Sequence, residues 1–151
     1  MDSFKNSLEQ LFAHLTSAPV TIDVVEDPET MQVNVTVDPG DSGALIGYHG
    51  ETIDGLQLIV SLMFNNNRAV YQPLQVDINQ YRQKRAQSLI VMADKAVQQA
   101  ITSEREILLP PLSPAERRLI HVHLQDHDQV STYSEGVGRA RRLVIRPKNT
   151  V

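Results

Sequence analysis

The stretch LIGYHGETI, residues 45–53, places two glycines three positions apart, directly before a run of apolar residues at helical spacing. Glycine lets the backbone adopt left-handed conformations and approach a ligand closely, because it has no Cβ. The second glycine lies where a long helix is predicted to begin, and the free N–H groups at a helix N-terminus favour anions such as phosphate. The stretch is therefore a candidate loop for binding a phosphate backbone, with a plain turn between helices as the alternative. The candidate loop residues are Gly47, Tyr48, His49 and Gly50.

The elements predicted around this loop follow the order helix, strand, strand, helix, loop, helix, strand. Helical spacing predicts a first helix that Pro19 closes, and two strands follow over residues 21–25 and 31–37. We expect Asp41 or Ser42 to cap the short helix before the loop. This order is typical of a KH domain of the bacterial, type II-like kind (α-β-β-α-α-β), in which a GxxG loop clamps nucleic-acid backbone. The groove beside Ile46 and Ile53 is then expected to receive bases.

The rest of the chain predicts one more strand of this domain, a long helix and a second, smaller unit. The strand covers residues 74–78 and the helix residues 81–103. Ser113 and Glu116 are three residues apart, which is the spacing of a helix-capping box, and Pro114 lies at the first position of the predicted helix. Two further strands, over residues 130–134 and 142–146, are joined through a glycine-containing turn. The predicted fold class is α+β, with a KH domain over residues 1–104, including the trailing helix, and a small α/β domain over 105–151.

The helix of the second unit carries a pair of side chains suited to nucleic acid. Arg117 and His121 are four residues apart, so both lie on one face of the helix. A forked cationic donor beside a small titratable donor suits a phosphate or the edge of a base. Such a pair is also common by chance on a protein surface, and that reading remains the alternative.

Charge is distributed unevenly along the chain, whose net charge is -4. Residues 1–41 hold eight acidic side chains and one basic one, whereas residues 139–148 hold five basic side chains and no acidic one. Such asymmetry indicates polyanion binding. The alternative is a solvated basic strand that balances the acidic half. The basic candidates for binding are Arg139, Arg141 and Arg142.

Several other classes of protein are disfavoured by what the sequence lacks. Without cysteine, disulfides and thiolate chemistry are excluded, which fits a reducing cytoplasm. No apolar run is long enough to span a membrane and no signal peptide is visible, so we expect a cytoplasmic protein without membrane insertion. His123 and His127 share a helical face, but residue 124 is Leu where a zinc helix of this type needs Glu. We therefore expect no metal, no other cofactor and no catalytic residue.

Three strings in this order resemble the SpoIIIJ-associated (Jag) family of bacterial RNA-binding proteins. They are LIGYHGETIDGLQ, ERRLIH, and TYSEG followed by RRLVIRP, and the resemblance covers roughly residues 18–148. It implies a KH domain followed by a domain named after its Arg-x-x-x-His signature. The family's backbone-clamping loop maps onto residues 47–50, its signature pair onto Arg117 and His121, and its basic strand onto Arg141 and Arg142. The resemblance further implies a non-enzymatic protein that binds single-stranded RNA, acts post-transcriptionally in cell-envelope growth and division, and partners a smaller KH-domain protein.

The middle of the loop departs from the pattern of RNA-binding KH domains, which usually place Lys or Arg there. This chain has Tyr48 and His49 instead, so the loop lacks a permanent cation. Tyr48 could stack on a base, and the electrostatic contacts are expected mainly in the C-terminal third. The departure leaves open a protein-interaction module that has lost most RNA binding. A hydrolase that uses the histidines is a second alternative.

Overall fold

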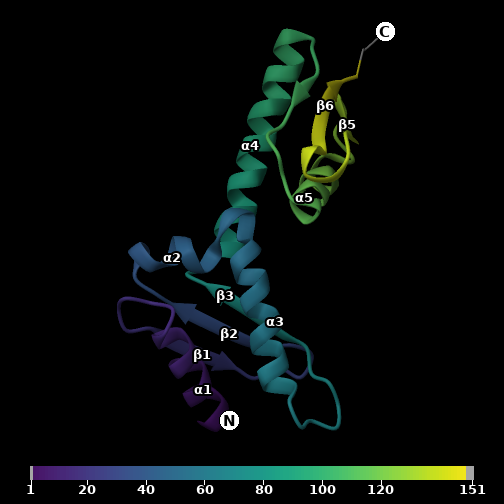
Figure 1. Cartoon of the computed structure of the whole chain (residues 1–151). Coiled ribbons are helices and arrows are strands. Elements are labelled where there is room, and N and C mark those ends of the chain that lie inside the picture. Colours follow the sequence, from purple (N-terminus) through teal and green to yellow (C-terminus); the bar gives the residue numbers. More distant parts are fainter. Residues whose placement is uncertain (1, 149–151) are drawn as a thin grey trace. The chain divides into compact units, whose positions relative to one another are not determined.

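The structure, a computed structural model, describes residues 2–148 (Figure 1). The chain divides into two compact units between Arg82 and Gln83. The elements of the first unit are α1 (Asp2–Ala13), β1 (Thr21–Val25), β2 (Met31–Thr36), α2 (Pro39–Ile46), the 3-10 helix η1 (Tyr48–Gly50), α3 (Glu51–Asn65) and β3 (Leu74–Ile78). Their order confirms the KH topology predicted from the sequence.

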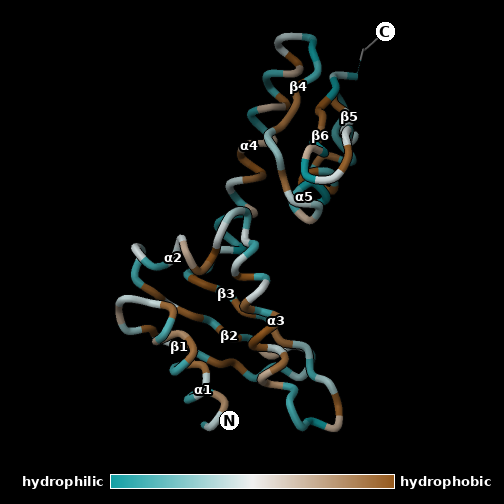
Figure 2. The backbone as a smooth tube through the Cα atoms, viewed as in Figure 1, coloured by the Kyte–Doolittle hydropathy of each residue, from teal (hydrophilic) through white to brown (hydrophobic). Residues whose placement is uncertain are grey.

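The sheet of the first unit has the order β1-β2-β3. β1 pairs antiparallel to β2, and β2 pairs parallel to β3, with Val33 opposite both Val24 and Val76. Along β2 the apolar side chains are buried and Asn34 and Thr36 are exposed, because successive side chains of a strand point to opposite faces of the sheet. Figure 2 marks hydrophobic residues along the strands and along α3.

Helices α1 and α3 provide the other half of this core. Phe4 of α1 and Phe64 of α3 pack ring against ring, with centroids 4.8 Å apart. The buried side chains of the unit come from its three α-helices and all three strands. They include Leu8, Phe12, Ile22, Val33, Val35, Ile53, Val60, Val76 and Ile78.

The cap of α2 differs from the prediction of Asp41 or Ser42. Asp38 is the N-cap, and its side chain accepts a hydrogen bond of 2.8 Å from the Gly40 N–H. Pro39 then occupies the first helical position, where a missing N–H costs nothing. Asp41 lies one turn further on, and its carboxylate instead accepts from the backbone N–H groups of Ser17 and Ala18, at 2.9 and 3.3 Å. Asp41 thus ties the segment after α1 to α2.

The second unit is built around the long helix α4 (Tyr81–Ser103), which begins two residues before the division. The elements that follow are β4 (Ile107–Leu108), α5 (Pro114–Leu124), β5 (Val130–Glu135), the 3-10 helix η2 (Gly138–Ala140) and β6 (Arg142–Pro147). The predicted capping box of α5 is confirmed, because Ser113 and Glu116 exchange side-chain to backbone hydrogen bonds of 3.2 and 2.8 Å.

The division between the units lies at the start of α4, whereas the sequence placed the domain boundary at its end, at 104/105. The two boundaries differ because the buried side of α4 packs within the second unit. Leu89, Ala93 and Val97 of α4 share one core with α5 and with the second sheet. α4 therefore serves as a wall of the second unit. Among residues 2–148, none of the helices combines the length and the hydrophobicity that a membrane span requires.

The second sheet has the order β4-β6-β5, with β6 antiparallel to both neighbours. Leu143 and Ile145 of β6 point into the core that α4 and α5 share. Because successive side chains of a strand point to opposite faces, Arg142 and Arg146 lie on the other face of the sheet.

Candidate nucleic-acid interface

The loop between α2 and α3 requires glycine at its first position. Gly47 has φ 73° and ψ −178°, and its N–H donates to the Gly43 carbonyl oxygen at 2.9 Å. A Cβ on Gly47 would lie 2.1 Å from the Thr52 hydroxyl oxygen and 2.8 Å from the Thr52 backbone nitrogen. Any larger residue would push this loop away from the start of α3.

The second glycine lets the chain turn into α3. Gly50 is the N-cap of α3 in a left-handed conformation with φ 86°, and its N–H donates to the Gly47 carbonyl oxygen at 3.3 Å. A Cβ on Gly50 would lie 3.3 Å from a ring carbon of Tyr81. His49 between them also has a positive φ, 51°. The loop is therefore a compact turn in which three of four residues have left-handed backbone.

Tyr48 and His49 present aromatic surface at the tip of this loop. The Tyr48 side chain is 70% exposed, and its ring packs edge-on against the His49 ring with centroids 3.9 Å apart. Such a surface can stack on a base. Two acidic residues, Glu51 and Asp54, occupy the first turn of α3 and work against phosphate at this end of the helix.

The two isoleucines predicted to line the groove have different surroundings. Ile46 is half-buried and packs against the core of the first unit. Ile53 is only 1% exposed and belongs to that core. Ile53 therefore supports the loop from beneath, and only Ile46 of the pair reaches the surface.

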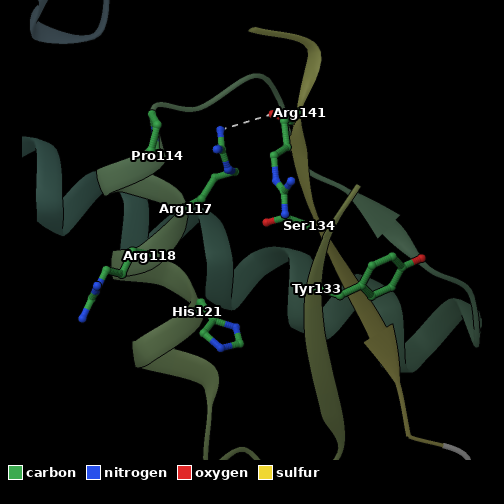
Figure 3. A pocket seen from close by; sticks show the side chains of 7 residues that line it. All are labelled: Pro114, Arg117, Arg118, His121, Tyr133, Ser134 and Arg141. Atoms are coloured by element: carbon green, nitrogen blue, oxygen red, sulfur yellow. Dashed lines mark hydrogen bonds between the residues drawn. The ribbon is translucent and has the colours of Figure 1, made fainter. Parts of the chain in front are cut away.

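In the second unit, the signature pair joins α5 to the surrounding loop and strands (Figure 3). The Arg117 guanidinium donates to the carbonyl oxygen of Leu112 at 2.7 Å and to that of Arg141 at 3.4 Å. One turn later, His121 Nδ1 lies 2.6 Å from the hydroxyl oxygen of Thr132 on β5. These hydrogen bonds fix α5 to the preceding loop, to Arg141 and to β5. Both side chains also line a pocket.

That pocket, open to solvent and about 510 Å³ in volume, lies between α5 and the hairpin of β5 and β6. Its lining contains three arginines and one histidine and no acidic residue, which makes it attractive to an anion. In Figure 3 the Arg141 side chain reaches toward Ser134, while the Tyr133 ring points away from the pocket. The lining residues are Pro114, Arg117, Arg118, His121, Tyr133, Ser134 and Arg141.

The structure divides the predicted basic tail into two groups. Arg141 lines the pocket, whereas Arg142 pairs in register with Glu135 on the other face of β6. Arg139 is exposed in η2 and is outside the pocket lining. Arg118 is a pocket residue that the sequence-based set omitted. Its position beside Arg117 was the available signal, but the course of the hairpin that completes the pocket was not visible in the sequence.

On the opposite face of the sheet, one carboxylate gathers a tyrosine and an arginine. The Tyr133 hydroxyl donates to Glu106 at 3.0 Å, Arg146 forms an ion pair with the same carboxylate, and the guanidinium lies 4.9 Å from the centre of the Tyr133 ring. The hydrogen bond from Arg146, with that from Tyr133, lowers the pKa of Glu106. The bond to Glu106 raises the pKa of Tyr133. The positive charge of Arg146 is thus paired with the Glu106 carboxylate.

The remaining histidines of the second unit have separate partners. His123 Nε2 lies 2.9 Å from an Asp94 carboxylate oxygen on α4, and His127 Nδ1 accepts from the Gln129 N–H at 3.1 Å. Residues 2–148 contain no group of three or more His, Asp or Glu side chains that could hold a metal.

Comparison with known protein families agrees with this geometry. A model described as the KhpA/KhpB KH domain matches residues 5–78, and a model of the R-3-H domain matches residues 87–147. A protein of Bacillus subtilis named "RNA-binding protein KhpB" is 32% identical over 142 residues, which cover 92% of this chain and 67% of that protein. The chain belongs to the KhpB family.

Other members of the KhpB family show how much of such proteins the chain covers. The protein of the same name from Clostridium symbiosum is 35% identical over 141 residues, which are 93% of this chain and 63% of that protein. The one from Lactiplantibacillus plantarum is 31% identical over 137 residues, or 91% of this chain and 42% of its own length. The chain thus spans between two fifths and two thirds of these KhpB proteins. The family assignment confirms the resemblance to the Jag family.

Proposed function

We propose that the chain is a non-enzymatic, cytoplasmic protein that binds single-stranded RNA, with phosphates held mainly in the pocket of the second unit. The observation that carries this function is the pocket lining, in which three arginines and His121 meet no acidic side chain. The names of the KhpB relatives, which describe them as RNA-binding, support the same reading.

The two units contribute differently in this proposal. The second unit supplies permanent positive charge, which makes binding depend on salt. The loop of residues 47–50 offers the exposed Tyr48 ring but no permanent cation. We therefore expect the loop to orient the RNA strand, and the pocket of the second unit to provide most of the affinity for RNA.

Two neighbouring arginines, Arg141 just before β6 and Arg142 at its start, provide a matched test. Arg141→Gln removes a pocket cation, and Arg142→Gln removes the same charge from the other face of the strand. Binding of a labelled single-stranded oligouridylate is measured by fluorescence anisotropy at several salt concentrations. Arg141→Gln should weaken binding about three- to fivefold and make the salt slope shallower by about 0.7, one phosphate contact on a single strand. Salt-independent binding by the unchanged chain, or equal effects of the two variants, would contradict the proposal.

A role in protein interaction is a second candidate, favoured by the exposed side of α3. Leu58, Ile59 and Leu62 lie within one turn of each other there and are 61%, 47% and 64% exposed. We propose a smaller KH-domain protein as the partner and post-transcriptional control of cell-envelope growth and division as the process, both implied by the family. Co-purification with such a protein, lost in Leu62→Glu but kept in Arg141→Gln, would separate this role from RNA binding.

A further inference from the structure

The outer edge of β3 is closed by side chains of its own unit. The Gln57 side chain of α3 donates to the Leu74 carbonyl oxygen at 2.8 Å and accepts from the Val76 N–H at 3.1 Å. Through these two bonds Gln57 occupies the positions that a neighbouring strand would take. Arg82 satisfies a third backbone group of this edge, because its Nε donates to the Val76 carbonyl oxygen at 3.4 Å.

The guanidinium of Arg82 also reaches the first turn of α3. Its Nη2 donates to Asp54 at 3.2 Å and to the Gln57 side-chain oxygen at 3.3 Å. The Arg82 side chain is 38% exposed and the Asp54 side chain 68% exposed. An ion pair this open to water is worth little, so a phosphate can compete with Asp54 for the guanidinium.

The place of Arg82 matters because the loop beside it has no cation of its own. Tyr81, the preceding residue, is the ring that lies against Gly50, the last residue of the loop. Asp54 is one turn beyond Gly50 on α3. Arg82 therefore places a permanent positive charge at the N-terminal end of α3, directly after the loop, although Arg82 is far from the loop in the sequence.

We propose that Arg82 is the phosphate-binding cation of the KH unit, and that Asp54 competes with phosphate for it. Arg82 takes the electrostatic role that Tyr48 and His49 do not fill, and Gln57 keeps the guanidinium near the loop. This inference rests on the proposed RNA binding and adds a residue to it. It also predicts that removing Asp54 strengthens binding through Arg82 rather than through the loss of negative charge alone.

The test uses the full chain and a labelled oligouridylate of about 20 nucleotides, longer than the four nucleotides that a KH loop clamps. Arg82→Gln should weaken binding about three- to fivefold and make the salt slope shallower by about 0.7. Arg68→Gln is the matched control, because Arg68 follows the other end of α3, where it bonds to the Phe64 carbonyl oxygen. Arg82→Lys should retain most of the affinity, since an ammonium still binds phosphate as a point charge.

A double-mutant cycle tests the role of Asp54. Asp54→Asn should strengthen binding about twofold in the unchanged chain and have little effect when Arg82 is already Gln. Thermal unfolding of every variant shows whether the fold is kept. The inference is overturned if Arg82→Gln and Arg68→Gln bind alike, if Arg82→Lys fails as fully as Arg82→Gln, or if Asp54→Asn acts equally in both backgrounds. Absence of salt-dependent binding by the unchanged chain would instead overturn the proposed RNA binding itself.

Discussion

Asn79 and Val37 hold each other through a reciprocal pair of hydrogen bonds. The Asn79 side-chain oxygen accepts from the Val37 N–H, and its amide nitrogen donates to the Val37 carbonyl oxygen, both at 3.0 Å. Asn79 and Gln80 both have positive φ, 51° and 57°, in the turn between β3 and α4. Left-handed backbone is unfavourable for most residues other than glycine and asparagine, and it persists where hydrogen bonds fix it.

Removal of these two bonds should destabilise the first unit. We expect Asn79→Ala to lower the free energy of unfolding by about 2 kcal/mol, because both Val37 groups lose their partner. Asn67→Ala is the matched control, since Asn67 also has a positive φ, 65°, but lies in an exposed turn. The difference between the two variants in urea denaturation isolates the side-chain bonds. Equal losses would show that only the backbone conformation matters.

One glycine of the candidate loop and one glycine of the following helix should respond oppositely to alanine. Gly47→Ala places a Cβ against Thr52 in a backbone region nearly exclusive to glycine, so we expect a loss of at least about 2 kcal/mol. Gly55→Ala, on α3, meets nothing within 4 Å and should stabilise the helix by up to about 1 kcal/mol. Thermal unfolding measures both. A stable Gly47→Ala protein would contradict the steric role of Gly47.

A cation placed in the loop should strengthen RNA binding. His49→Lys adds a permanent charge to the loop that the proposal expects to orient the RNA, so the affinity for a single-stranded oligonucleotide should rise several-fold. The salt slope should become steeper by about 0.7. Gln10→Lys adds the same charge on the exposed side of α1 and serves as the control. An equal gain in both variants would indicate only a general effect of net charge.

The carboxylate of Glu106 should make stability depend on pH in the acid range. Arg146 and Tyr133 lower its folded pKa below the ordinary value of 4.5. A lowered pKa means that the fold favours the ionised carboxylate, so this stabilisation is present above pH 4.5 and lost as the pH falls through the folded pKa. Glu106→Gln should therefore flatten the acid limb of unfolding measured against pH. Identical limbs for Glu106→Gln and the unchanged chain would contradict this role.

Local sequence patterns predicted most of the fold because their causes are local. Helical and alternating spacing identified the main helices and strands, and the Ser113 capping box depends only on residues within one turn. The same spacing that identified α3 also assigns Ile53 to the buried side of this helix. The burial of Ile53, which removes it from the expected groove, could therefore have been predicted from the sequence. The choice between Asp38 and Asp41 as the cap of α2 was not, because it depends on where the chain leaves β2.

The candidate site was less visible because it is assembled across elements. Arg141 has extended backbone directly before β6, so Arg141 and Arg142 face opposite ways, but only the packing of α4 and α5 decides which of them borders the pocket. Likewise, the ion pair of Arg82 with Asp54 joins residues 28 positions apart. No spacing rule within one helix or strand could have indicated it.

The closed edge of β3 has a consequence for the behaviour of the protein at high concentration. A strand with unsatisfied donors and acceptors on its outer side is a template for pairing with another chain, and such pairing leads to aggregation. Gln57 satisfies the Leu74 carbonyl and the Val76 N–H. Gln57, together with Arg82 on the Val76 carbonyl oxygen, therefore discourages intermolecular β-sheet formation at this side of the sheet of the first unit.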